Sequence, residues 1–311
     1  MNSTNSARVE SRHGLLLIMI AAVLWGTVGI TTKFIYGLAA TNPLSIGLLR
    51  LVLSLPVLFA VCWVTQKKRM FRVAGRDLLL MLLVGMMTAV YQVCYFSAIE
   101  RTGVAVATLV TLCTAPVMVA VISVFVTRQR PSAYVLLSLV GALAGTALLV
   151  GFQENAVGNG TDKSGIILAL GSALGYALVT LITRKLAGCY HPFQTIAISF
   201  GFGAIILFVF ASAQGIVLDY PPMGWSLLLY LGAIPTALAY VLFIAGMRYT
   251  TATVASISTL LEPLVATILA WLIFDERFSP MGFIGVVLLS GSLALLYMGG
   301  TTKVRKLAGA G

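Results

Sequence analysis

The sequence contains few charged residues. Of its 311 residues, 9% are charged and 59% are hydrophobic. Soluble domains carry roughly 25% charged residues, so this chain lacks the polar surface that a water-facing protein requires. Lipid is therefore its expected solvent, and we predict an all-α integral membrane protein.

Cysteine, histidine and catalytic motifs are also scarce. The four cysteines are Cys62, Cys94, Cys113 and Cys189. They show no metal-ligand spacing, and three of them fall inside or at the end of apolar runs. We find no HExxH motif, Walker loop or nucleophile elbow. We therefore expect the chain not to be an enzyme, and we expect no cofactor and no metal.

Long apolar runs dominate what is present. A spanning helix needs about 20 mostly apolar residues. The candidate runs are 14–35, 44–65, 77–99, 104–127, 132–151, 164–186, 193–214, 224–247, 252–274 and 279–298. The first run is long enough to span and is followed by no convincing cleavage site, so we interpret it as a retained helix and not as a signal peptide. The sequence thus predicts ten transmembrane helices.

The positive charges predict the orientation. The formal net charge is +11, but cations such as Lys67-Lys68-Arg69 sit between apolar runs, so we do not expect nucleic acid as a partner. If the N-terminus is inside, fifteen of the 20 Lys and Arg residues fall on the inner side and four on the outer side. The remaining one, Arg50, lies within an apolar run. Because cytoplasmic loops carry an excess of Lys and Arg, we expect both termini in the cytoplasm.

The two halves of the chain resemble each other. Val84–Ser132 aligns without gaps on Leu231–Ser279 at an offset of 147. The identical pairs are Gly85/Gly232, Phe96/Phe243, Ala98/Ala245, Arg101/Arg248, Ala105/Ala252, Pro116/Pro263, Arg130/Arg277 and Ser132/Ser279. In the first helices, Trp25 stands opposite Tyr176. Because each repeat contains an odd number of helices, the second copy has the opposite orientation in the membrane, as in many secondary transporters.

This repeat predicts the organisation of the chain. We expect a cytoplasmic N-terminus at 1–13 and a first five-helix repeat at 14–151. An external linker at 152–163 then leads to a second five-helix repeat at 164–298 and a cytoplasmic C-terminus at 299–311.

The segments RTGVAVATLVTLCTAPVMVAVISVFVTRQRPS and RYTTATVASISTLLEPLVATILAWLIFDERFS resemble the two halves of the EamA-type drug/metabolite transporter family. The second segment keeps the Glu262-Pro263 and Glu276-Arg277 pairs of such halves, whereas the first has Ala115 before Pro116. Within the family, the chain looks most like bacterial amino-acid exporters, including the aromatic branch. The resemblance implies a bacterial-type inner membrane, export, and a central cavity lined by helices 1, 3, 4, 6, 8 and 9.

Glu262 is the first candidate site residue. It lies near the centre of the ninth run, where an ionisable group is costly. The adjacent Pro263 removes a backbone donor and opens nearby carbonyls. The carboxylate can bind a substrate amine or a proton, or it can be protonated and hydrogen-bond a neighbouring helix.

Arg50 is the second candidate. It lies about six residues into the second run, on the outer side. Its planar guanidinium suits a substrate carboxylate. The alternatives are that it snorkels to the outer headgroups or pairs with another helix.

A third group consists of aromatic and amide side chains. They are Trp25, Tyr91, Gln92, Tyr95, Tyr176 and Tyr240. Together they suit a half-apolar pocket for an amino acid, and each is equally explained by helix packing. Candidate bend or gating residues are Pro56, Pro116, Pro235 and Pro263, with Pro116 and Pro263 expected to bend their helices at matching depths.

These observations predict a secondary transporter that exports amino acids by alternating access. Its expected partners are an amino-acid substrate and the lipid bilayer, and we expect a monomer. Three alternatives remain open: a transporter of another metabolite or a cationic drug, a membrane enzyme acting on lipid, and a channel. Competition by a panel of solutes tests the first, the lack of clustered His, Asp or Ser motifs at run ends argues against the second, and single-channel currents or unsaturable flux would indicate the third.

Overall fold

The computed structural model describes residues 2–128, 131–151, 163–274 and 279–299. Within these ranges every regular element is helical, and ten helical spans are long and apolar enough to cross a membrane. The elements are α1 (Asn2–Leu38), α2 (Pro43–Gln66), η1 (Lys67–Phe71), α3 (Gly75–Thr102), α4 (Val104–Thr127), α5 (Ala133–Gly151), α6 (Lys163–Leu186), α7 (Pro192–Gln214), α8 (Pro222–Leu231), η2 (Gly232–Leu238), α9 (Ala239–Met247), α10 (Ala252–Ser258), α11 (Leu261–Phe274) and α12 (Pro280–Gly299). The prediction of ten membrane-spanning helices is confirmed.

The helix bounds differ from the prediction in three places. The first helix begins at Asn2 and not at 14, because no proline or glycine interrupts the polar residues that precede the apolar run. The eighth span is α8, a π-helical segment and α9 in series. The ninth span is divided into α10 and α11. Hydropathy reports where a chain can cross the bilayer, but the course of the backbone within the bilayer depends on local hydrogen bonding.

The packing of the helices has an approximate two-fold symmetry. The first helix of the second repeat, α6, packs against α3 and α4 of the first repeat. In the same way, the first helix of the first repeat, α1, packs against α9 and α11 of the second repeat. Likewise α3 packs against α7, and α2 packs against η2 and α8. The pairs α2 with α7 and α5 with α12 join equivalent helices of the two halves. Exchanging the first five spans for the second five therefore maps each of these contacts onto another contact or onto itself. The halves form an inverted pair, since each contains five spans.

Two of the repeated glycines occupy matching contacts. A Cβ added to Gly85 would collide with backbone atoms of Ser199 and Gly203 in α7. A Cβ added to Gly232 would lie 2.8 Å from the Cβ of Leu53 in α2. Small residues let the backbones of neighbouring membrane helices approach closely, and here both copies use the same residue at the same crossing.

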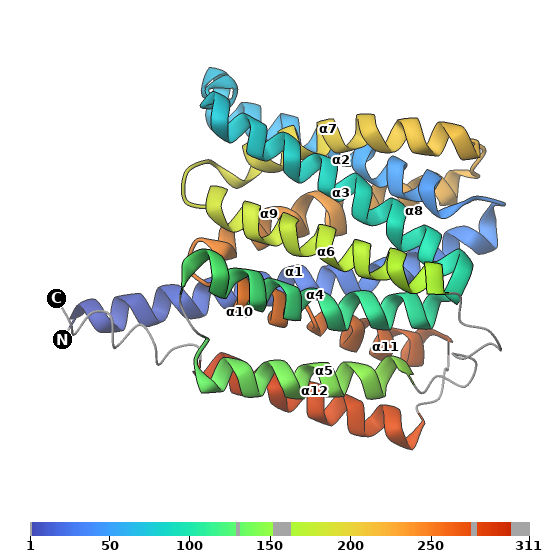
Figure 1. Cartoon of the computed structure of the whole chain (residues 1–311). Coiled ribbons are helices and arrows are strands. Elements are labelled where there is room, and N and C mark those ends of the chain that lie inside the picture. The colour runs from blue at the N-terminus through green and yellow to red at the C-terminus, as the bar shows by residue number, and fades with distance from the viewer. Residues whose placement is uncertain (1, 129–130, 152–162, 275–278, 300–311) are drawn as a thin grey trace.

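The start of α1 and the end of α12 lie at the same end of the helix bundle (Figure 1). At this end, the loop after α6 is joined to the loop after α9. Arg248 donates from Nε to the carbonyl of Ala187 at 2.6 Å and from Nη2 to that of Tyr190 at 2.6 Å. Arg184 donates from Nε to the carbonyl of Thr250 at 2.6 Å. Guanidinium groups thus connect the ends of spans six and eight.

The loop between α2 and α3 is attached to the same region. Tyr190 donates from its hydroxyl to Asp77 Oδ2 at 2.7 Å. Gln194 donates from Nε2 to the carbonyl of Met70 at 2.9 Å, and Gln194 is buried. Three loops at this end are therefore linked by side-chain hydrogen bonds.

His191, which lies between α6 and α7, makes the stability of this region depend on pH. Burial of its imidazole, and to a lesser extent the charge of Arg248, lower the pKa of His191 below its ordinary value of 6.5. The unfolded chain then binds more protons than the folded chain, so stability is present above about pH 6.5 and is lost as the pH falls toward the folded-state pKa. We expect His191→Gln to reduce the loss of thermal stability between about pH 7 and pH 5. Melting curves in detergent measure this effect, and His13→Gln, at an exposed histidine of α1, is the matched control. Identical pH dependence in wild type and His191→Gln would contradict the assignment.

Candidate functional site

An aromatic cluster lies where the two halves meet. The hydroxyl groups of Tyr91 in α3 and Tyr240 in α9 are 3.0 Å apart. The Tyr240 ring packs edge-on against Trp25 of α1, with ring centroids 4.9 Å apart, and Trp25 also packs against Phe243 at 5.2 Å. The Tyr91 ring meets Tyr176 of α6 edge-on at 6.0 Å. The first and sixth spans, which are repeat equivalents, thus contribute to one continuous set of rings.

The ring of Trp25 leaves one polar atom of this cluster without a partner. Trp25 is 6% exposed, and its Nε1 is buried with no hydrogen-bond partner in the part of the chain that the structure describes. A buried indole N–H ordinarily donates a hydrogen bond, so this atom is an unused donor beside Tyr240.

The helix of the ninth span is interrupted at Thr259 and Leu260, shortly before Glu262. Pro263 has no N–H, so the carbonyl of Thr259 cannot receive the usual helical bond from it. That carbonyl accepts instead from the backbone N–H of Glu262 at 2.9 Å, and the N–H of Leu260 donates to the carbonyl of Ile257 at 3.1 Å. These tighter turns separate α10 from α11 and place Glu262 at the first turn of a membrane-embedded helix.

The first turn of α11 faces α1 at a glycine. A Cβ added to Gly26 would lie 3.0 Å from the carbonyl oxygen of Glu262 and 2.7 Å from the Cβ of Val265. This glycine lets α1 approach α11, and it is adjacent to Trp25 in the sequence. Glu262 is therefore held next to the aromatic cluster by a backbone contact.

The Glu262 side chain is only partly buried, although the nine residues that precede Leu261 are all buried. No hydrogen bond to its carboxylate is found among the described residues. An ionisable group at this depth without a partner is unusual, because burial of an unpaired charge is costly. The carboxylate is thus available to a bound solute or proton.

Arg50 supplies a charge of the opposite sign. It is partly buried, and its Nε donates to Thr236 Oγ1 at 3.2 Å, in the π-helical segment of span eight. Its charge is close enough to act electrostatically on Glu262, Tyr91 and Tyr240. Within the described parts of the chain, no ion pair joins Arg50 to Glu262. Because Thr236 is buried, this bond directs the guanidinium into the helix bundle.

Two predicted residues lie beside the cluster with partners of their own. Tyr95 and Thr108 are joined by their hydroxyl groups at 2.6 Å, which links α3 to α4. Gln92 donates from Nε2 to the carbonyl of Thr88 at 3.3 Å, and its Oε1 lies against Gly47 of α2. Hydrogen bonds within the protein thus occupy the Tyr95 hydroxyl and the Gln92 amide nitrogen.

The four predicted prolines occupy different settings. Pro56 and Pro116 lie inside α2 and α4, which run without interruption. Pro235 lies within the π-helical segment, and Pro263 follows the break between α10 and α11. Span four is thus continuous and span nine is interrupted, while matching bends at Pro116 and Pro263 stay a prediction. Near Pro263, hydroxyls compete for backbone carbonyls: Thr259 Oγ1 donates to Ser256 and Ser258 Oγ to Val254. Such bonds weaken a helix.

Sequence reasoning missed several residues that complete the site. Thr236 holds Arg50, and Thr259 accepts from the Tyr176 hydroxyl at 3.4 Å. The ring of Phe200 packs edge-on against Tyr240 at 4.8 Å. Only the positions of the two threonines could have identified them in the sequence: Thr236 follows Pro235, and Thr259 lies three residues before Glu262.

Comparison with known proteins defines the class of this fold and site. A family model described as the EamA-like transporter family matches residues 12–151 and again residues 163–298. The chain belongs to this family, and it is a multi-pass membrane transporter. The predicted family is confirmed, while the narrower resemblance to amino-acid exporters is not specifically supported by the relatives that match.

The relatives extend over nearly the whole chain. The uncharacterized transporter YwfM of Bacillus subtilis is 31% identical over 293 residues, covering 94% of this chain and 96% of that protein. The uncharacterized inner membrane transporter YicL of Salmonella typhimurium is 26% identical over 303 residues, covering 95% and 99%. A solved crystal structure superimposes with a TM-score of 0.81 at 19% identity, covering 94% of this chain and 98% of that one, which shows a shared fold.

Proposed function

We propose that this transporter exports amino acids, including aromatic and other neutral ones, across a bacterial-type inner membrane by alternating access. The observation that carries the proposal is the arrangement of Arg50 and Glu262, two charges that are not paired with each other and that both lie near one aromatic cluster. A zwitterion carries a carboxylate for the guanidinium and an ammonium group for the carboxylate. The rings accept its apolar side chain.

The free indole N–H of Trp25 supports the same assignment. It lies within the cluster and has no hydrogen-bond partner among the described residues, so a carboxylate or carbonyl oxygen of a substrate can accept from it. Bound substrate would then satisfy a donor that the empty protein leaves unsatisfied.

The two charges are not repeated, which favours a substrate with distinct ends. Both α2 and α7 begin at a proline, and the residue of α7 that corresponds to Arg50 is Ser199. The repeat equivalent of Glu262 is Ala115. Two copies of one backbone therefore present one cation and one anion, and an amino acid fits between them in a single orientation.

The packing of span nine supports alternating access. Near the termini, α10 packs mainly against α4 of the other half, and beyond the break α11 packs mainly against α1, which also belongs to the other half. The α10 residues are all buried, and several α11 residues from Leu261 onward are partly exposed. The complete burial of α10 is the observation that supports closure of the halves on the side of the termini, the side that the positive charges predict to be cytoplasmic. The break at Thr259–Leu260 and the π-helical segment are the points where the closed side would open.

Transport into proteoliposomes tests this proposal. We expect saturable counterflow of labelled phenylalanine, tryptophan and leucine, and no transport of phenethylamine, which keeps the ring and ammonium group but lacks the carboxylate. Rates equal to those of empty vesicles for every amino acid would refute the amino-acid assignment. Transport of phenethylamine in preference to phenylalanine would instead assign an organic-cation substrate, for which the aromatic rings and Glu262 alone suffice.

A further inference from the structure

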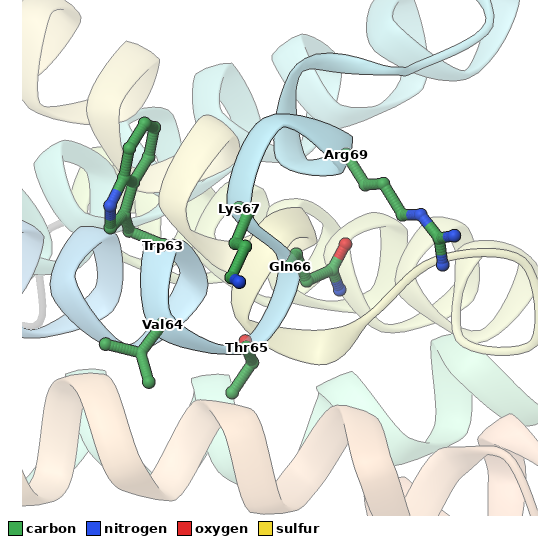
Figure 2. Close-up of a pocket in the computed structure, with 6 residues that line it drawn as sticks. All are labelled: Trp63, Val64, Thr65, Gln66, Lys67 and Arg69. Carbon is green, nitrogen blue, oxygen red and sulfur yellow. The ribbon is translucent and has the colours of Figure 1, made fainter.

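A surface hollow of about 890 Å³ lies at the end of α2, away from the aromatic cluster. Its lining comes from six residues that close the second span and enter η1: Trp63, Val64, Thr65, Gln66, Lys67 and Arg69. Figure 2 shows the indole of Trp63 and the side chain of Val64 on the left, Lys67 beside Gln66 in the middle, and Arg69 on the right.

The apolar side of the hollow belongs to the membrane. Trp63 is 53% exposed and Val64 is 76% exposed, although both lie in the last turn of a spanning helix. In a membrane protein such side chains contact lipid, and tryptophan prefers the level of the headgroups. This wall therefore lies where the acyl chains meet the headgroup region.

The polar side is cationic. Lys67 and Arg69 are both exposed, and they stand within three residues of each other at the membrane surface. The backbone turns sharply at Lys67, with φ 52° and ψ −134°, and its N–H donates to the carbonyl of Trp63. This uncommon conformation for a residue with a side chain ends α2 and starts the short η1 segment that carries both cations lining the hollow.

Hydrogen bonds from α7 hold the segment that follows this turn. Gln194 of α7 is buried and donates from its side-chain amide to the carbonyls of Met70, at 2.9 Å, and Arg72, at 3.4 Å. The cations therefore project from a segment that is attached to the helix bundle.

The equivalent position in the second repeat carries no charge. Counted from the prolines that open α2 and α7, Lys67 corresponds to Ile216 and Arg69 to Leu218. The inverted fold thus does not require cations here, and they occur on one membrane face only.

We propose that this hollow binds an anionic phospholipid. Its phosphate lies between Lys67 and Arg69, its polar headgroup reaches Gln66 and Thr65, and its acyl chain runs along Trp63 and Val64. Charge complementarity selects an anionic headgroup, and the exposed apolar wall selects a lipid over a water-soluble phosphate. This assignment is independent of the transported solute.

Native mass spectrometry of the full-length detergent-solubilised protein tests the site, with phosphatidylglycerol and phosphatidylcholine as probes. We expect wild type to retain phosphatidylglycerol in preference to phosphatidylcholine, and Lys67→Ala/Arg69→Ala to weaken phosphatidylglycerol binding at least tenfold. The matched control is Arg72→Ala/Arg76→Ala, which removes two nearby exposed cations, one before α3 and one in its first turn, that do not line the hollow. The control is expected to bind like wild type.

Two further measurements make the result decisive. The charge-preserving variant Lys67→Arg/Arg69→Lys is expected to retain phosphatidylglycerol, and inorganic phosphate is expected not to displace it. The proposal is overturned by equal retention of the two lipids, by equal losses in the two double alanine variants, or by displacement with inorganic phosphate, which would assign a site for soluble anions. None of these readouts requires transport, so they leave the amino-acid assignment untouched.

Discussion

Substitution of Glu262 by glutamine is expected to reduce amino-acid counterflow at least tenfold. The change keeps the size of the side chain and removes its charge, so the substrate ammonium group loses a charge-assisted hydrogen bond. Such bonds contribute about 1.5–3 kcal/mol, and each 1.4 kcal/mol is about a tenfold change in binding. Among the described residues the carboxylate accepts no hydrogen bond, so the substitution removes only the attraction of Arg50 and is expected to be mild for the fold.

The matched control is Glu100→Gln, at an exposed glutamate near the end of α3. Counterflow at saturating and subsaturating phenylalanine separates binding from turnover. Unchanged counterflow in Glu262→Gln would remove Glu262 from the site and leave its structural role as the alternative. If Glu262 carries a coupled proton, the same variant also loses the pH dependence of transport; if it binds only the amine, that dependence persists while the KM rises.

Substitution of Gly85 by alanine is expected to destabilise the protein, although it adds one methyl group. The added carbon would meet the backbone carbonyl of Ser199 and the backbone nitrogen of Gly203, and backbone atoms cannot rotate away as a side chain can. Overpacking of this kind costs about 1–3 kcal/mol, which corresponds to a fall in melting temperature of roughly 2–10 °C.

Gly201→Ala is the control for this experiment, because a Cβ at Gly201 of α7 meets no atom within 4 Å. Melting temperatures from fluorescence-detected size-exclusion chromatography compare the two variants. Gly232→Ala, at the repeat-equivalent crossing with α2, is expected to resemble Gly85→Ala. Equal melting temperatures for Gly85→Ala and Gly201→Ala would contradict the close contact between α3 and α7.

The asymmetry between the halves links these results to function. Gly85 and Gly232 are repeated because both copies need the same helix crossing, whereas Arg50 and Glu262 each occur in one copy. The repeated glycines thus serve the helix packing that both halves need. The proposed orientation of the substrate depends on Arg50 and Glu262, which are not repeated.

The number of spans, the repeat and the family could be predicted from the sequence. Each follows from local composition: apolar runs of sufficient length, punctuation between them, and identical residues at a constant offset. Glu262 and Arg50 were also identifiable as candidates, because a charged residue in an apolar run is rare whatever it contacts. The bounds of α1 were less predictable, since a helix continues beyond the part that is apolar.

The amino-acid sequence by itself determined that this chain is an integral membrane protein, that it crosses the bilayer ten times, and that its second half repeats the first in inverted form. Only the tertiary structure decided that Trp25, Tyr91, Tyr176 and Tyr240 form one cluster beside Glu262, that Gln92 binds within its own helix, and that the ninth span is broken where the fourth is continuous. The physical reason is that burial in lipid depends on the composition of a segment, whereas a site depends on which faces of distant helices meet, and that is set by packing across the whole bundle.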